Sequence, residues 1–204
     1  MRAVIVSGGK IEDYEKIKSY ILPDDYVIAA DSGYDHLKIM RIKPDIVIGD
    51  LDSVKDKKIG ENLIKLQVMK DETDTEAAVN IAIEKGFDEI LILAGLGTRF
   101  DHSVANVFLL KYLASKYVKA MVLNEYNEIY YFSGVIELSG KKGDILSIIP
   151  ISDTTGIETS GLLYSLSLDT LKAGYSRGVS NVFTGNSCRI TAKSGEGFII
   201  KSRD

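Results

Sequence analysis

The chain has 204 residues, of which 45% are hydrophobic and 26% charged, which is typical of a globular protein with one large domain or two small ones. Its net charge of −4 argues against duplex nucleic acid as a partner, because such binding usually requires a basic face. A single cysteine, Cys188, excludes an internal disulfide, and the N-terminal run MRAVIVSGG is too short in apolar residues for a signal peptide or a membrane span. We therefore expect a cytoplasmic protein without a membrane partner.

Strand and helix patterns alternate through the first 123 residues. Runs of β-branched and apolar residues predict strands at Arg2–Val6, Tyr26–Ala30, Asp45–Ile48, Glu89–Leu93 and Val118–Leu123. Helical spacing predicts helices at Ile11–Ile21, Gly33–Met40, Thr73–Lys85 and Ser103–Lys116. The segment Leu63–Met69 is ambiguous and fits a short strand after a helical turn. Such alternation, with short glycine-bearing turns, predicts βαβ units and an open parallel sheet.

The second half of the chain has a different pattern, with short β-rich runs separated by turn signals such as SGKKGD, SDTTG and KSGEG. The predicted strands are Glu128–Phe132, Val135–Leu138, Asp144–Ile149, Arg189–Ala192 and Gly197–Lys201. We found no convincing helical periodicity there, so an antiparallel sandwich or barrel is expected. The change of pattern predicts an α/β domain over residues 1–124 and a β domain over residues 125–204.

Carboxylates gather near the predicted strand ends of the first half. They are Asp31, Asp50, Asp52, Asp71, Asp74 and Asp101. In an open parallel sheet the ligand crevice lies outside the carboxyl ends of the strands, so these side chains are expected to share one edge. Carboxylates that meet there repel one another unless a cation holds them. Mg²⁺ is the natural candidate, because it takes oxygen ligands and often bridges them to phosphates.

Two acidic motifs carry most of this prediction. In GDLDS, Asp50 and Asp52 are two residues apart and would point to the same side of an extended chain, toward one metal ion. The same pattern also fits an ordinary turn that caps a helix. In KDETDTE, residues 70–76, acidic groups would cap the following helix and complement its dipole. One cap does not need the additional carboxylates of Asp71 and Asp74, which suggests a function for them.

Two glycine turns follow predicted strands: SGG, with Gly8 and Gly9, and GLGTRFDH, with Gly95 and Gly97. Backbone N–H groups in such turns can hold phosphate, and Arg99 adds a charge with bidentate geometry. Each could equally be a simple tight turn, with Arg99 and Asp101 in a local salt bridge that contributes little. Of the two histidines, His102 lies in the second turn and could contact a ligand, whereas His36 is expected to be an ordinary surface or core residue.

In these motifs the sequence resembles the thiamine pyrophosphokinase (thiamine diphosphokinase) family. The resembling segments are ADSG at 30–33, PDIVIGDLDS at 44–53, KDETDTEAA at 70–78, GLGTRFDHSVAN at 95–106, TSGLLYSL at 159–166 and GYSRGVSN at 174–181. They span nearly the whole chain in the expected order, and GDLDS together with GxRFDH is the specific pair. The resemblance implies an N-terminal Rossmann-like α/β domain, a C-terminal thiamine-binding β-sandwich and a homodimer.

The activity implied by this resemblance is transfer of pyrophosphate from ATP to thiamine, giving thiamine diphosphate and AMP, with Mg²⁺ as cofactor. The implied catalytic residues are Asp50, Asp52, Asp71, Asp74 and Arg99, of which the first three are assigned to the metal. The candidate nucleotide-binding residues are Gly8, Gly9, Gly95, Gly97 and Arg99. The candidate substrate-binding residues are Asp31, Asp101, His102, Ser180 and Asn181.

The sequence departs from the family pattern at a few positions. Ser32 stands where the family often has glycine, and Thr98 where it has glycine or alanine. Some members stack the substrate on a C-terminal tryptophan, which this chain lacks, so Tyr164 or Tyr175 is a candidate to replace it. Two alternatives therefore stay open: a pyrophosphokinase of the same architecture acting on a 6-hydroxymethylpterin, and a non-catalytic nucleotide-binding regulator.

Overall fold

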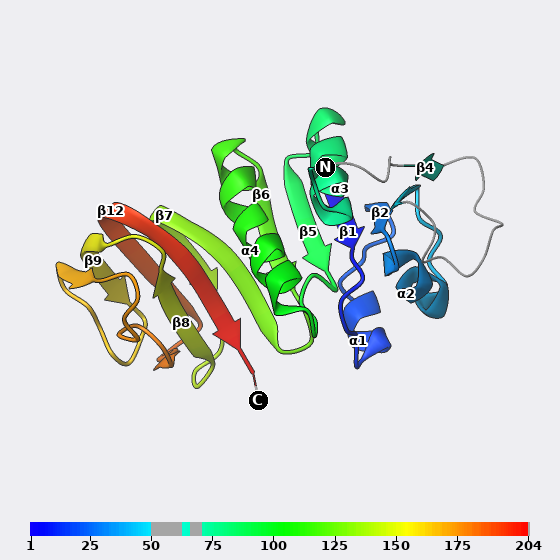
Figure 1. The fold of residues 1–204 in the computed structure, drawn as a ribbon. Coiled ribbons are helices and arrows are strands. Elements are labelled where there is room, and N and C mark those ends of the chain that lie inside the picture. The colour runs from blue at the N-terminus through cyan, green and yellow to red at the C-terminus, as the bar shows by residue number, and fades with distance from the viewer. Residues whose placement is uncertain (50–62, 66–70, 204) are drawn as a thin grey trace. The chain divides into compact units, whose positions relative to one another are not determined.

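The computed structural model describes residues 1–49, 71–203 and, by their backbone alone, 63–65. The chain divides into two compact units, Met1–Glu125 and Tyr126–Asp204 (Figure 1). It combines helices with strands that pair in both parallel and antiparallel directions, so the predicted α/β class is confirmed. Among the described residues, no helix has the length and apolar character needed to cross a membrane.

Every strand pair recorded within Met1–Glu125 is parallel. The strands are β1 Arg2–Val6, β2 Tyr26–Ala30, β3 Ile46–Gly49, β4 Leu63–Lys65, β5 Glu89–Leu93 and β6 Lys119–Leu123. Their order across the sheet is β6-β5-β1-β2-β3-β4. The chain therefore runs outward from β1 in one direction and returns to add β5 and β6 on its other side, which puts a topological switch point between β1 and β5.

Helices cover both faces of this sheet. They are α1 Tyr14–Lys18, α2 Gly33–Met40, α3 Asp74–Glu84 and α4 Phe100–Ser115. Val4 and Val6 of β1 share a core with Ile17 of α1 and Leu37 of α2. Ile5 points to the opposite face, because side chains alternate along a strand, and it is fully buried there. That second face is covered by α3, which packs on β1, β2 and β3.

The first helix is shorter than the predicted Ile11–Ile21. Asp13 caps it by accepting a hydrogen bond from the backbone N–H of Lys16 at 2.9 Å. The buried Glu125 accepts from the backbone N–H groups of Glu12 and Asp13, at 2.6 and 3.0 Å. Asp13 takes the N-cap position and Glu125 binds the amides of residues 12 and 13 ahead of the first turn, so the helix begins only at residue 14.

The unit Tyr126–Asp204 is built from antiparallel pairs. Its strands are β7 Asn127–Ser139, β8 Ile145–Pro150, β9 Thr154–Ser160, β10 Asp169–Leu171, β11 Asn181–Val182 and β12 Ser187–Ser202. One edge of β12 pairs with β7 along its length, while the other edge pairs first with β9 and then with β8. Inside lies a core of Phe132, Leu146, Ile148, Ile157, Leu162, Leu171, Phe183, Cys188, Ile190 and Ile199.

Two long strands replace four of the predicted short ones. The runs Glu128–Phe132 and Val135–Leu138 form the single strand β7, which passes through Gly134 in a left-handed conformation with φ of 81°. The two C-terminal runs likewise form the single strand β12, whose pairing with β7 shifts register between Thr191 and Glu196. A bulge of this kind interrupts the alternation of side chains without ending the strand, which explains the error.

Candidate functional site

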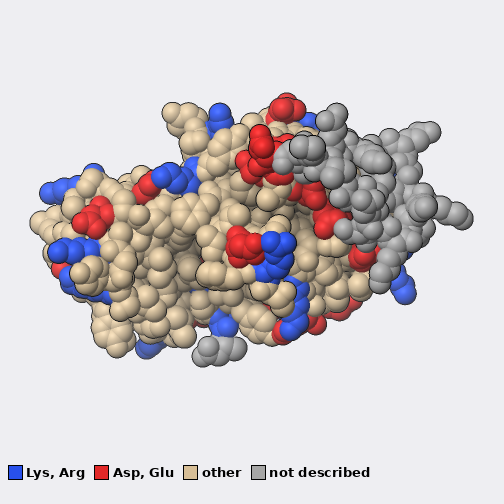
Figure 2. Space-filling view, in the orientation of Figure 1, with Lys and Arg blue, Asp and Glu red and all other residues tan. Residues whose placement is uncertain are grey.

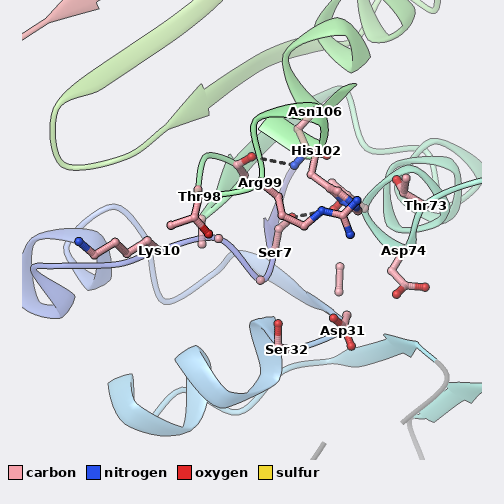
Figure 3. Close-up of a pocket in the computed structure, with 17 residues that line it drawn as sticks. Ser7, Lys10, Asp31, Ser32, Thr73, Asp74, Thr98, Arg99, His102 and Asn106 are labelled. Carbon is pink, nitrogen blue, oxygen red and sulfur yellow. Dashed lines mark hydrogen bonds between the residues drawn. The ribbon is translucent and has the colours of Figure 1, made fainter. Parts of the chain in front are cut away.

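A pocket of about 480 Å³ lies at the carboxyl ends of the parallel strands, at the switch point (Figure 3). It is formed by five segments, namely the turns after β1, β2 and β5 and the first turns of α3 and α4. Its lining residues include Ser7, Gly8, Gly9, Lys10, Asp31, Ser32, Thr73, Asp74, Thr75, Gly95, Gly97, Thr98, Arg99, His102 and Asn106. Strand-end crevices of this type are where open α/β sheets bind ligands.

The turns around the pocket approach one another so closely that only glycine fits. A Cβ on Gly9 would lie 2.4 Å from the carbonyl oxygens of both Ala94 and Leu96. A Cβ on Gly33 would lie 1.8 Å from the carbonyl oxygen of Val6, at the end of β1. The backbone of Gly9 also donates to Ala94 O at 2.7 Å. The pocket floor is therefore made of backbone packed on backbone.

Three helices begin at this pocket. The first residues of α2, α3 and α4 follow the lining residues Ser32, Thr73 and Arg99, which occupy the three N-cap positions. Thr73 makes a side-chain cap, because its Oγ1 accepts from the backbone N–H of Glu76 at 3.1 Å. Helix N-termini present unpaired N–H groups and the positive end of the helix dipole. The pocket is consequently suited to an anion such as a phosphate group.

Buried polar side chains hold these segments in place. Ser7 Oγ, at the end of β1, lies 2.9 Å from Thr75 Oγ1 in the first turn of α3, and both residues are buried. Asn106 on α4 donates from Nδ2 to the carbonyl oxygen of Gly95 at 2.7 Å. Ser103 Oγ accepts from the backbone N–H of Gly97 at 2.9 Å. The second glycine turn is thus fixed by the helix that follows it.

Charged side chains of both signs reach the pocket. Asp31 and Asp74 contribute carboxylates and Arg99 contributes positive charge, while the side chain of Lys10 runs away from the pocket and its amine pairs with Glu12 at 2.5 Å (Figure 3). Asp31 sits in a left-handed backbone conformation, with φ of 50°, at the end of β2. Acidic groups are also numerous on the face of Met1–Glu125 that Figure 2 shows. A ligand that combines phosphate groups with a cation would match this mixture.

The guanidinium of Arg99 is paired with Asp101. Its terminal nitrogen lies 2.6 Å from Asp101 Oδ2, and Nε donates to Oδ1 at 3.3 Å. The hydrogen bond from Arg99 lowers the pKa of Asp101, and the same bond raises the pKa of Arg99. Both side chains are exposed, at 71% and 64%, so the pair contributes little to stability. Arg99 can therefore be redirected toward a ligand at small cost.

The structure brings together many of the residues singled out from the sequence. The pocket lining includes Gly8, Gly9, Asp31, Asp74, Gly95, Gly97, Arg99 and His102. Asp71 is exposed and Asp101 is paired with Arg99, and neither is among the lining residues. Asp50 and Asp52 lie outside the described residues. Within the described part of the chain, no three His, Cys, Asp or Glu side chains form a cluster that could hold a metal ion.

Ser180 and Asn181 lie in the second unit, where the side chain of Asn181 forms hydrogen bonds with the backbone of Tyr164. Its Oδ1 accepts from the N–H of Tyr164 at 2.9 Å, and its Nδ2 donates to the carbonyl oxygen of Tyr164 at 2.7 Å. The side chain is buried, whereas the ring of Tyr164 is 65% exposed. Ser180 is exposed, with φ of 58°. Asn181 therefore fixes the segment that presents Tyr164.

Sequence reasoning missed the residues that hold the pocket together. Ser7, Thr75, Ser103 and Asn106 were not singled out, although all four are buried and hydrogen-bonded at the site. For Ser103 and Asn106 a signal was available, because they lie four and seven residues after Arg99 and so fall on one face of the helix that begins there. The pairing of Ser7 with Thr75 joins residues 68 positions apart, which no local pattern indicates.

Fold and site together define an α/β protein with a polar pocket, lined by helix N-termini, at the switch point of a parallel sheet. The family model for the thiamin pyrophosphokinase catalytic domain matches residues 17–122, and the model for its vitamin B1 binding domain matches residues 135–196. The chain belongs to the thiamine pyrophosphokinase family. The resemblance and the enzyme class inferred from the sequence are thereby confirmed.

Relatives of known name agree with this assignment. The chain is 27% identical over 209 residues to thiamine pyrophosphokinase of Bacillus subtilis, covering 98% of both chains. It is also 27% identical over 173 residues to thiamine pyrophosphokinase 1 of Oryza sativa subsp. japonica, covering 76% of this chain and 65% of that relative. The chain thus spans about two thirds of the plant protein's length but nearly all of the bacterial one.

Solved structures share the fold. The crystal structure of thiamine pyrophosphokinase from Bacillus subtilis superposes with a TM-score of 0.91 at 24% identity, covering 100% of both chains. Thiamin pyrophosphokinase from Candida albicans gives a TM-score of 0.82 at 16% identity, covering 99% of this chain and 89% of that one. The fold is therefore retained at low identity.

Proposed function

We propose that this chain transfers the pyrophosphoryl group of ATP to the hydroxyl of thiamine, giving thiamine diphosphate and AMP. The observation that carries this proposal is the pocket at the switch point, toward which three helices direct their N-termini, in a chain of this family. In the reaction, an oxygen–phosphorus bond forms between the thiamine hydroxyl and the β-phosphorus. The bond from that phosphorus to the oxygen bridging to the α-phosphate breaks, and AMP leaves.

The phosphates of ATP are assigned to the pocket lining. The turns that contain Gly8, Gly9, Gly95 and Gly97 offer backbone close to the ligand, and Arg99 offers a fork of N–H donors. Phosphoryl chemistry depends mainly on alignment and on stabilising charge. Holding the phosphates between two fixed turns would supply the alignment, and Arg99 would supply charge to the transferring group.

Mg²⁺ is proposed as the cofactor, supported by the two carboxylates in the pocket lining. Hard divalent cations prefer carboxylate oxygens, and Asp31 and Asp74 bring two carboxylates to the pocket. We assign Asp50, Asp52 and Asp71 as the principal ligands, as the sequence predicts, with Asp74 ligating or orienting. A bound Mg²⁺ would offset the negative charge of the phosphates.

Thiamine is assigned to the second unit, residues 126–204, which includes the segment matched by the B1-binding family model. Ser180, which is exposed, could touch the substrate directly. Asn181 would act through Tyr164, whose backbone it holds and whose ring is exposed. In the first unit, Asp31, Asp101 and His102 keep the candidate substrate-binding role that the family resemblance implies.

The finer architecture and the assembly are also proposals. We infer a Rossmann-like α/β catalytic domain, which the parallel strands support, followed by a β-sandwich, which the two-sided pairing of β12 around one core supports. We propose a homodimer in the cytoplasm. Analytical ultracentrifugation at working concentration tests the dimer, and a sedimenting monomer with full activity would contradict it.

The test of the reaction is a paired incubation. The protein is mixed with ATP, Mg²⁺ and either thiamine or 6-hydroxymethylpterin, and both AMP and the diphosphate product are quantified. We expect AMP and thiamine diphosphate in equal amounts and no pterin product. AMP formed only with the pterin would favour the alternative substrate. ATP binding without AMP in either mixture would favour the non-catalytic regulator.

A further inference from the structure

His36 connects two helices to a glycine turn of the pocket. It lies on α2, four residues after the N-cap Ser32, and is half-buried. Its Nε2 lies 2.7 Å from the carbonyl oxygen of Gly9, and its Nδ1 lies 2.9 Å from the hydroxyl of Tyr14, the first residue of α1. The rings of Tyr14 and His36 pack with centroids 5.7 Å apart. The imidazole is therefore bonded at both nitrogens.

The chemistry of the partners fixes the direction of both hydrogen bonds. A carbonyl oxygen can only accept, so Nε2 must carry the hydrogen that is donated to Gly9. In the neutral ring Nδ1 is then an acceptor, and the hydroxyl of Tyr14 donates to it. Burial raises the pKa of Tyr14, with further contributions from Asp35 and Glu125, so the phenol keeps its proton. The carbonyl oxygen of Gly9 thus selects the tautomer of His36 that carries hydrogen on Nε2, and the hydroxyl of Tyr14 complements that tautomer by donating to Nδ1.

The bond to His36 completes the restraint of the first glycine turn. On its other side, the N–H of Gly9 donates to Ala94 O, in the turn after β5. One helical turn before His36, Ser32 Oγ lies only 2.1 Å from where a Cβ on Gly8 would be. Residues four apart share one face of a helix, so Ser32 and His36 both face this turn. The peptide groups on either side of Gly9 therefore have one available orientation.

We propose that His36 is a positioning residue for the nucleotide, holding the turn Gly8–Lys10 in the orientation that binds phosphate. This inference rests on the proposed function, because it takes the ligand of the pocket to be ATP. His36 is absent from the pocket lining and acts only through Gly9. Its loss should therefore weaken ATP binding, while thiamine binding and the chemical step change little.

The test compares His36→Leu with His36→Gln. Leucine fills the space but cannot donate, whereas the glutamine amide can donate near the place of Nε2 and accept from Tyr14. Loss of one hydrogen bond that orders a binding turn should raise the KM for ATP and the dissociation constant of ATP about 5- to 10-fold in His36→Leu. We expect both to stay within about twofold in His36→Gln, with the KM for thiamine unchanged in either variant.

A second variant guards against misfolding. If His36→Leu does not fold, Tyr14→Phe takes its place in the test. This variant removes only the hydroxyl oxygen and should raise the KM for ATP about two- to threefold. An unchanged KM for ATP in a folded His36→Leu protein would overturn the proposal. Equal loss for ATP and thiamine, without rescue by glutamine, would also overturn it and indicate a purely structural role.

Failure of the proposed function gives a different result. If the unaltered protein binds ATP in calorimetry but makes no thiamine diphosphate, the reaction assignment fails, and the dissociation constants of the variants still decide the role of His36. If the unaltered protein binds no ATP, the pocket assignment and the role of His36 fail together.

Discussion

The two glycine turns of the pocket are held by different parts of the chain. The turn at Gly8–Gly9 is fixed by residues distant in sequence, through the backbone of Ala94 and the side chain of His36. The turn at Gly95–Gly97 is fixed by Ser103 and Asn106, from the helix that follows directly. One turn therefore depends on tertiary packing between segments, and the other on its own helix.

This difference predicts how far the effect of a substitution in each turn spreads through the site. A substitution that adds atoms to the first turn should disturb both turns, because their backbones are in contact. The resulting steric clash can be relieved only if the backbone of the second turn moves. Loss of a side-chain support of the second turn adds no atoms between the turns and should stay local, because these supports lie within one helix. The comparison can be tested by substitutions, taken here from the largest expected effect to the smallest.

The largest effect is expected from Gly9→Ala. The added Cβ would lie 2.4 Å from two backbone oxygens, which cannot retreat without moving the second turn. We expect a loss of about 3 kcal/mol in the free energy of unfolding and a loss of about 100-fold in kcat/KM. Denaturant unfolding and AMP formation measure these. The matched control is Gly185→Ala, where the new Cβ meets nothing within 4 Å. Equal behaviour of the two variants would refute the close packing of the turns.

Arg99→Lys tests the charge carried by the second turn. Lysine keeps the positive charge but loses the planar fork, so we expect kcat/KM to fall about tenfold or more at unchanged stability. Steady-state kinetics with ATP and thiamine measure it. Asp101→Asn serves as the control for stability, since it removes the ion pair and leaves Arg99 in place. Near-normal kinetics for the lysine variant would mean that Arg99 serves only its local pair with Asp101.

Asn106→Leu removes the main support of the second turn. Asn106 is 5% exposed, and its loss would leave the carbonyl oxygen of Gly95 without its donor. We expect the free energy of unfolding to fall by about 1–3 kcal/mol and the KM for ATP to rise. Hydrogen exchange should increase in the second turn and stay unchanged in Gly8–Lys10. Equal increases in both turns would contradict local support.

The smallest effect concerns the pair of Arg99 with Asp101. The folded protein lowers the pKa of Asp101 below its ordinary value of 3.8, so the pair's contribution is present above that pH and is lost as pH falls through the lowered pKa. Both groups are exposed, so we expect Asp101→Asn to leave the Tm unchanged at pH 7 and to leave the acid unfolding curve in place. A different result would show a stronger pair: a Tm of Asp101→Asn several degrees below that of the unaltered protein at pH 7, with the difference disappearing at pH 2.

The sequence predicted those parts of the site that local patterns encode. Asp31 after β2, Asp74 at the start of α3 and the glycines of both turns could be foreseen, because a parallel sheet brings its carboxyl ends and the helix starts that follow them to one edge. The strands of the first unit were also foreseen closely, since buried parallel strands are continuous apolar runs.

What the sequence could not predict depends on which segments meet. His36 has no motif around it, and its role follows only from the packing of α2 against the turn after β1. Ser7 and Thr75 likewise become partners through the fold. In the second unit, β7 and β12 were divided at Gly134 and at the bulge near Glu196, because a break in alternation resembles a turn.

The most direct test of the pocket assignment is hydrogen–deuterium exchange of the intact protein with and without ATP and Mg²⁺, in the absence of thiamine. If both glycine turns hold the phosphates, exchange should slow together in residues 7–10 and 95–99. Exchange should stay unchanged in residues 15–27 and 42–45, which contain the lining of the separate surface cavity near Pro23. Slowed exchange confined to that cavity, or no slowing in either turn at saturating ATP, would contradict the assignment.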